Sequence, residues 1–307
     1  MYTRLFISVL LVTLSTIART ANPAQIPIKL VGKMILVQAT IDGIEGNFIL
    51  DTGIRNVVLN SKYFKGSPID RQFHGINGEV GEMQAAYFQV ELASFRWKGI
   101  YAEIIPLQHL ESLKGKPIHG LIGGHIFRNY ALWLDYAGQE MWLEKTPESW
   151  ATSFFSSDNP SMIEAQQFKY KGGSPCISIN IGGSPFMFSL DTGAETNILD
   201  TRFKAALSPY YNIDSQTVLY SFRKESSETS YTRLYSLQVG RLPCRPMRTS
   251  FLNLSEWNRV SAGPTVDGIL GYEFFDQFKV CIHFKKRMIY LIPNEDPHAR
   301  EIFTTKK

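Results

Sequence analysis

Two acidic residues, Asp51 and Asp191, occupy the same kind of setting in this chain of 307 residues. Each follows a short apolar run, Phe48–Leu50 in one case and Phe188–Leu190 in the other, and each is followed by threonine and glycine. A carboxyl group can accept and donate a proton, and a glycine allows the backbone beside it to turn sharply. The two tripeptides therefore place a residue type suited to acid–base chemistry on two loops of the same kind.

The surroundings of the two tripeptides show that the chain contains an internal repeat. The second Asp-Thr-Gly lies 140 positions after the first, and the copies align around it without gaps. The matching residues are Lys29, Gly32, Ile41, Gly43, Phe48 and Leu50 with Lys169, Gly172, Ile181, Gly183, Phe188 and Leu190. A second similarity, between His119–Gly123 and Asp267–Gly271, lies at an offset of 148. Two copies predict a pair of homologous lobes rather than a solenoid.

The segments between these landmarks are short and rich in β-forming residues. Residues 34–41 and 47–50 predict a hairpin, residues 56–59 a buried strand, and residues 130–136 and 140–144 a closing hairpin. Short helical turns are expected within 104–113 and within 125–129. No long amphipathic pattern occurs, so the predicted fold class is all-β.

The same reading divides the chain into five parts. They are a signal peptide at 1–21, an N-terminal lobe at 22–145, a linker at 146–166, a C-terminal lobe at 167–295 and a tail at 296–307. Arg4 precedes an apolar run at 5–17 that ends in small residues, which is typical of a secretory signal. The predicted localisation is therefore secreted or periplasmic, and an uncleaved anchor is the alternative.

Composition and charge narrow the classes of partner. Hydrophobic residues make up 44% and charged residues 20% of the chain, as in soluble globular proteins. The net charge is +4 without a long basic run, so nucleic acid is not expected as a partner. Three cysteines cannot form a complete disulfide framework, and we interpret them as small buried residues, with one bridge as the alternative. Six histidines lack ligand spacing, so neither a metal nor a cofactor is expected.

The two Asp-Thr-Gly motifs resemble the active-site motif of the aspartic protease superfamily, which includes pepsins and retropepsins. Each is followed by a glycine, two apolar residues and a second glycine, which begin 69 residues after Asp51 and 77 residues after Asp191. The resemblance covers residues 26–145 and 165–293, and each lobe is close to a retropepsin subunit in size. It implies a bilobal acid-protease fold, with two homologous β-barrel-like lobes and the active site between them.

The resemblance also implies an activity, that of an aspartic endopeptidase. Asp51 and Asp191 would be the catalytic pair, because two carboxylates so close together share one proton and can activate a water between them. It assigns support of the active site to the residues that follow the acids: Thr52, Gly53, Thr192 and Gly193. The threonines would hydrogen-bond across the lobe junction, and the glycines would allow tight turns. The implied partner is a peptide or protein in extended conformation, and the implied state is a monomer.

Gly75-Ile76-Asn77-Gly78 resembles the glycine–isoleucine flap tip of retropepsins. A flap would hold an extended peptide by main-chain pairing and exclude water. The alternative is an ordinary glycine-rich hairpin without a role in binding.

One position departs from the family pattern. Ile54 and Arg55 follow the first tripeptide, whereas a small residue, as in Ala194, is usual in the family. A cation beside the acids would favour ionisation of both and disturb the sharing of a proton, whereas an Arg55 side chain in solvent or paired with another acid would not affect it. Two other functions are therefore considered, a pseudoprotease that binds peptides without cutting them and a structural envelope protein. Both acids and both threonines are intact, which favours catalysis.

Overall fold

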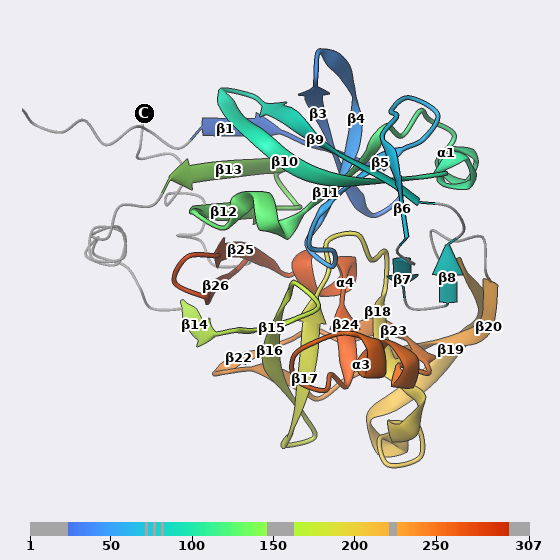
Figure 1. Cartoon of the computed structure of the whole chain (residues 1–307). Coiled ribbons are helices and arrows are strands. Elements are labelled where there is room, and N and C mark those ends of the chain that lie inside the picture. Colours follow the sequence, from blue (N-terminus) through green and yellow to red (C-terminus); the bar gives the residue numbers. More distant parts are fainter. Residues whose placement is uncertain are drawn as a thin grey trace, which may run out of the picture.

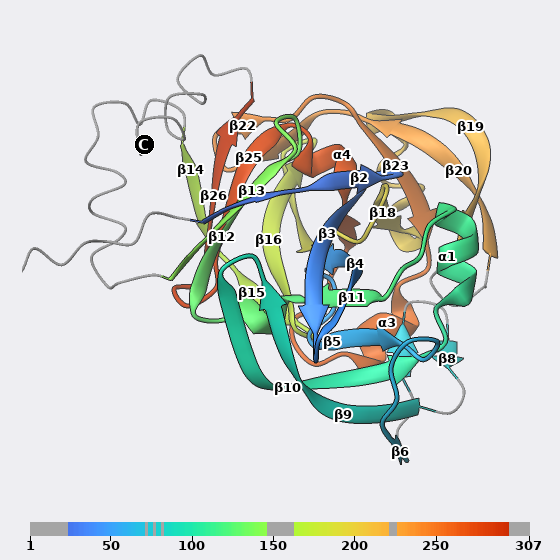
Figure 2. The ribbon, with the colours of Figure 1, turned by 90° about the horizontal axis from the view of Figure 1, so that it is seen from above.

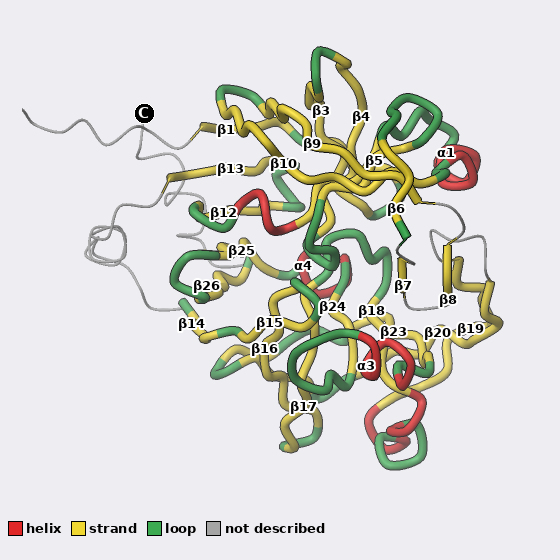
Figure 3. Tube along the Cα trace, in the orientation of Figure 1, coloured by secondary structure: helices red, strands yellow, loops and turns green. Residues whose placement is uncertain are grey.

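A computed structural model describes residues 24–70, 73–75, 78–80, 83–145, 163–220 and 226–294. Figure 3 shows that strands make up most of this part, with only short helices, which confirms the all-β prediction. The predicted signal peptide, most of the predicted linker and the predicted tail lie outside the described residues. Within them, no helix is long and apolar enough to span a membrane.

The N-terminal lobe is built on an eight-stranded sheet. In chain order its strands are β2 (Lys29–Val31), β3 (Met34–Ile41), β4 (Ile44–Asp51), β5 (Val57–Asn60), β6 (Ser67–Ile69), β9 (Met83–Leu92), β10 (Phe95–Ile105) and β11 (Gly120–Gly123). Strand β3 pairs with β9 as well as β4, so β3, β4, β11, β5, β10 and β9 close into a barrel. A separate hairpin, β7 (Phe73–Gly75) with β8 (Gly78–Val80), follows β6. The short helices are α1 (Gln108–Lys114) and η1 (Gly124–Phe127).

The C-terminal lobe repeats this arrangement with a ten-stranded sheet. Its strands are β15 (Lys169–Lys171), β16 (Ser174–Ile181), β17 (Ser184–Leu190), β18 (Asn197–Asp200), β19 (Tyr211–Tyr220), β20 (Ser226–Leu234), β21 (Leu237–Val239), β22 (Leu242–Pro243), β23 (Met247–Leu252) and β24 (Gly268–Leu270). Its short helices are η2 (Thr201–Phe203), η3 (Ser208–Tyr210), α3 (Ser255–Val260) and α4 (Tyr272–Phe275). Here β16 pairs with the short β21 and not with β20, so the sheet is less closed than its counterpart.

A six-stranded sheet joins the two lobes. The N-terminal half contributes β1 (Ala24–Pro27), β13 (Glu140–Lys145) and β12 (Tyr130–Asp135), and the other half β25 (Phe278–His283), β26 (Met288–Pro293) and β14 (Glu164–Gln167). Strands β12 and β25 pair at the centre, where Leu132 lies opposite Ile282. The four inner strands of this sheet, β13, β12, β25 and β26, run side by side in both Figure 1 and Figure 2. Strand β14 begins within the stretch predicted as linker.

The apolar runs before the two acids are buried at the centres of the lobes. Phe48, Ile49 and Leu50 are fully buried because β4 lies between β3 and β11, which explains a continuous apolar run instead of an alternating one. Phe188 and Leu190 are buried in the same way in β17. One hydrophobic core cluster includes residues of both lobes and of the shared sheet. Both acids are thus carried by rigid strands anchored in one core.

The local predictions can be compared with these elements. The helical turn expected within 104–113 is α1, displaced towards its C-terminal end because β10 continues to Ile105. The turn expected within 125–129 is η1. The three cysteines are free, and Cys176 and Cys281 are buried. The alternative of one disulfide bridge is therefore not found.

Candidate active site

Each acid lies at the point where a central strand leaves its sheet. Strand β11 runs parallel to β4 and places Gly123 beside Asp51, while β24 runs parallel to β17 in the other lobe. A Cβ atom on Gly123 would lie 2.2 Å from the Asn56 carbonyl oxygen, and one on Gly271 would lie 2.4 Å from the Ala194 carbonyl oxygen. Glycine at the end of each Gly-apolar-apolar-Gly motif is therefore required for the strand to pass close behind the acidic loop.

The two glycines after the acids bring the carboxyl groups together. The Gly53 N–H donates to Asp51 Oδ1 over 2.9 Å, and the Gly193 N–H donates to Asp191 Oδ1 over 2.8 Å. A Cβ atom on Gly53 would lie 2.4 Å from the carboxyl carbon of Asp191, and one on Gly193 would lie 2.7 Å from that of Asp51. Each acid therefore lies directly against the loop of the other lobe, where no side chain would fit.

The threonines hold the two loops in this arrangement. The Thr52 hydroxyl donates to the Leu190 carbonyl over 2.9 Å, and the Thr192 hydroxyl donates to the Leu50 carbonyl over 2.7 Å. Each hydroxyl also accepts a backbone N–H of the other threonine, at 3.0 and 3.1 Å. Both threonines are fully buried. Four hydrogen bonds therefore cross the lobe junction directly beneath the acids, where the resemblance places them.

Burial is the main cause of the altered acidity of the pair. It raises the pKa of Asp51 well above the usual range, and the charge of Asp191 and a hydrogen bond with it add to this rise. Burial also raises the pKa of Asp191, but hydrogen bonds from Asp51 and from backbone N–H groups of Gly193, Gly53 and Ala194 oppose it. The pKa values of both acids are thus raised, and the pair as a unit keeps a proton to higher pH than isolated aspartates do. Such a pair can act as acid and base at once.

Arg55 lies at the junction of the two lobes. Its side chain is exposed, and its Cβ and Cγ atoms approach Gly173 of the other lobe, where a Cβ would lie 2.5 Å from Arg55 Cβ. The pKa values of Asp51 and Asp191 are set by burial, by the two acids themselves and by backbone N–H groups. Arg55, the departure from the family pattern, is not among these causes.

Tyr136 is a nearby residue that sequence reasoning did not select. Its hydroxyl is buried and has no hydrogen-bond partner within the described residues. Burial raises the pKa of Tyr136 well above its usual range, and Asp191, Tyr272 and Asp51 add to the rise. Its equivalent in the second copy is Phe284. This difference of one hydroxyl between the copies is the sequence feature that could have drawn attention to Tyr136.

The predicted flap lies partly within the described residues. Gly75 and Gly78 are paired at the ends of β7 and β8, whereas Ile76 and Asn77 lie outside the described residues. Figure 1 shows this hairpin between the two lobes, and β7 approaches helix α3 of the C-terminal lobe. The described part of the hairpin thus lies close to the C-terminal lobe although it belongs to the N-terminal one.

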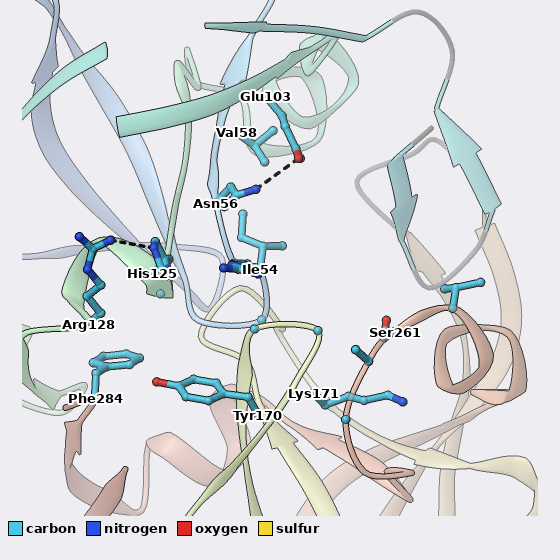
Figure 4. A pocket seen from close by; sticks show the side chains of 18 of the residues that line it. Ile54, Asn56, Val58, Glu103, His125, Arg128, Tyr170, Lys171, Ser261 and Phe284 are labelled. Carbon is cyan, nitrogen blue, oxygen red and sulfur yellow. Dashed lines mark hydrogen bonds between the residues drawn. The ribbon is translucent and has the colours of Figure 1, made fainter. Parts of the chain in front are cut away.

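A cavity of about 1210 Å³ opens between the lobes (Figure 4). The N-terminal lobe contributes residues 53–56, and the C-terminal lobe contributes 171–173 and 260–263. Gly53, which lies against the Asp191 carboxyl, forms part of the wall, so the cavity adjoins the first acidic loop, although neither acid lines it. Its size is that of a site for a small ligand or part of a peptide.

The two histidines around the glycine loop have structural contacts. His119 accepts the Asn47 N–H at Nδ1 over 3.2 Å and stacks on Tyr63 with ring centroids 4.1 Å apart. His125 Nε2 accepts a hydrogen bond from Arg128 over 2.9 Å. In the part of the chain that the structure describes, no group of three histidine, cysteine or acidic side chains is placed to hold a metal ion.

The sequence was compared with models of known protein families. A sequence model described as "Aspartyl protease" matches residues 37–126 and 177–274, and each matched region contains one Asp-Thr-Gly. Together these regions span more than half of the chain. The chain belongs to the aspartyl protease family. The resemblance based on the two tripeptides is thereby confirmed at the level of the family.

Comparison with solved structures addresses the fold of this aspartyl protease family member. The crystal structure of an aspartic proteinase from Irpex lacteus is similar, with a TM-score of 0.52 and 12% sequence identity. The similarity covers 92% of this chain and 99% of that chain. At this identity the likeness shows the fold alone, and it confirms the bilobal acid-protease architecture. A search of curated proteins found no match.

Proposed function

We propose that this protein is an aspartic endopeptidase that hydrolyses peptide bonds with a water activated between Asp51 and Asp191. The observation that carries this proposal is the reciprocal packing of each carboxyl group on the other lobe's glycine. Two carboxyl groups held this close favour a single shared proton. The family and the fold support a protease function at the coarser level.

In the proposed mechanism Asp51 starts protonated and Asp191 starts ionised; exchanging these two roles gives the same chemistry. Asp191, ionised, takes a proton from the water as its oxygen attacks the peptide carbonyl carbon, while Asp51 gives its proton to the carbonyl oxygen. The resulting diol intermediate collapses when Asp191 delivers the proton to the amide nitrogen and the C–N bond breaks. The hydroxyl proton then returns to Asp51, which restores the starting state.

The substrate in this proposal is an extended peptide between the lobes. The hairpin β7–β8 supplies main-chain groups near α3, where an extended strand could pair with them. One chain supplies both acids, so the proposed active unit is a monomer. A secreted or periplasmic location is proposed from residues 1–21 alone.

The test is incubation with a diverse peptide library across pH, with products identified by mass spectrometry. We expect internal cleavage at acidic pH and its loss when a peptide that carries a hydroxyl-bearing transition-state mimic, such as statine, is added. Cleavage that continues in the presence of the mimic would point to another enzyme in the preparation. A fully folded protein that cuts no peptide at any pH would instead favour the pseudoprotease or structural alternatives.

A further inference from the structure

A buried lysine distinguishes the second copy of the repeat from the first. Lys171 ends β15 and is only 2% exposed, whereas the equivalent residue of the first copy, at the end of β2, is Val31 at 5%. The two strands otherwise share the same burial pattern. A valine fits this position without cost, while a buried ammonium group is costly unless an anion or hydrogen bonds compensate for it.

Compensation for Lys171 is incomplete within the described residues. Its amine donates to the Asn258 carbonyl over 2.9 Å, and burial lowers the pKa of the amine, with the Cys176 thiol as the opposing group. Lys171 is part of the cavity wall, and Figure 4 shows its side chain extending past Ser261. An ammonium group has three N–H donors, and the described residues supply an acceptor for one of them.

Other cations surround the same cavity. Arg55, Arg128, Lys285 and Arg287 also line it, against two acids, Asp70 and Glu103. None of these four cations forms an ion pair with an acid among the described residues. A concave wall with one sign of charge in excess concentrates the field and attracts the opposite charge. The cavity is therefore suited to an anionic part of a ligand.

The opposite side of the acidic pair has a different charge arrangement. The repeat places Glu195 where the first copy has Arg55. Glu195 accepts the Lys33 N–H over 3.0 Å and pairs with Lys114 over 2.8 Å. Lys33 in turn forms an ion pair with Glu273. Lys33 and Lys114 are thus paired with acids of the other lobe, in contrast to the four cations that line the cavity.

We propose that the cavity between residues 53–56 and 171–173 binds a carboxylate of the substrate, on one side of the bond that is cut. Lys171 and Arg55 supply the recognition, with Lys171 as the buried donor and Arg55 as the exposed cation from the other lobe. The carboxylate comes either from an aspartate or glutamate side chain or from the free C-terminus of a short peptide. This inference rests on the proposed protease function and adds a substrate class to it.

The test compares matched peptide pairs that differ in one charge. Cleavage sites from the library identify the peptide position that faces the cavity, and kcat/KM is then measured for glutamate against glutamine there, and for free-acid against amide C-termini. In the wild-type protein we expect the charged member to be preferred by about tenfold, as for a charge-assisted hydrogen bond. The pair that shows the preference identifies the source of the carboxylate.

Three variants separate recognition from folding. Lys171→Val introduces the residue that the first copy already buries, and Arg55→Gln changes an exposed side chain, so both variants should fold. Both should bring the ratio of kcat/KM between the charged and the neutral peptide towards one. Lys169→Val removes the same charge from an exposed position of the same strand and should leave the ratio as in the wild type. Thermal unfolding checks that each variant is folded.

The outcomes distinguish this inference from the proposed function. Equal cleavage of charged and neutral peptides by the wild type, abolished by Asp51→Asn, would overturn the inference and leave the protease function standing. A preference that Lys171→Val and Arg55→Gln both preserve would also overturn it. Absence of cleavage of every peptide would overturn the proposed function together with the inference.

Discussion

The folded protein holds the carboxyl group of Asp51 in surroundings that disfavour its ionised form. It is 6% exposed and lies beside a second acid, while only the N–H groups of Gly53 and Ile54 oppose the rise of its pKa. A site that shares a proton between two acids therefore reduces the stability of the fold at pH values at which both acids tend to ionise. This cost at the residue scale can be measured apart from catalysis.

We expect Asp51→Asn to raise the thermal unfolding midpoint at neutral pH. The folded-state pKa of Asp51 lies above its unfolded value, so the folded state binds more protons and stability falls as pH rises between the two values. Asparagine does not titrate, and its advantage should disappear below about pH 3.9, the ordinary aspartate pKa. Unfolding scans across pH measure the difference. Glu45→Gln, at an exposed acid, is the control, and an Asp51→Asn protein no more stable than this control at pH 7 would contradict the expectation.

The pH dependence of turnover provides a second prediction for single residues. The active form carries one proton on the pair, and raised pKa values keep that proton to higher pH. Neither Ile54 nor Ala194 has a side chain that can donate to the carboxylates, so we expect an optimum at about pH 4 to 6. Ala194→Ser adds a donor that favours the charged form and should shift the profile of kcat against pH to lower values. A profile that the serine leaves unmoved would refute this explanation.

At the scale of elements, the turn after each acid is the critical segment. Gly53→Ala would place a methyl group 2.4 Å from the Asp191 carboxyl carbon, so the loop or the acid must move. Displacements of about 1 Å at a catalytic centre cost roughly 10²-fold in rate, and we expect at least that loss in kcat.

Gly43→Ala is a suitable control for this variant. Gly43 lies in a turn at a φ of +82°, with no atom within 4 Å of the added Cβ, so alanine there strains the backbone away from the acids. We expect lower stability with unchanged kcat for the control. Similar losses of kcat in both glycine variants would show that general destabilisation, and not the contact with Asp191, accounts for the effect.

The elements also show how far the sequence could predict the structure. The central strands and both acidic loops could be predicted from the repeat. The apolar runs at Phe48–Leu50 and Phe188–Leu190 are local patterns that indicate buried strands, and both are buried. The pairing of β12 with β25 could not be read in this way, since the partners lie about 150 residues apart and sequence alone does not reveal which edges meet. The cavity likewise depends on the contact between Arg55 and Gly173, which only the assembled lobes create.

At the scale of the whole molecule, the two lobes form a single unit. The shared six-stranded sheet, the common core and the four threonine hydrogen bonds all cross between them. We therefore expect specific activity to stay constant on dilution, measured as initial rate per mole of protein over a wide range of concentrations. A steep fall at low concentration would show that two chains each supply one acid.

The central claim is that Asp51 and Asp191 act as one catalytic pair. The most direct measurement is the kcat of Asp51→Asn and of Asp191→Asn, each compared with the wild type on one cleaved peptide, with folding verified by thermal unfolding. Either substitution removes one member of the pair and should lower kcat by at least ~10²–10⁴-fold, the effect of losing a general acid or base. A folded single variant that retained a rate near that of the wild type would contradict the claim.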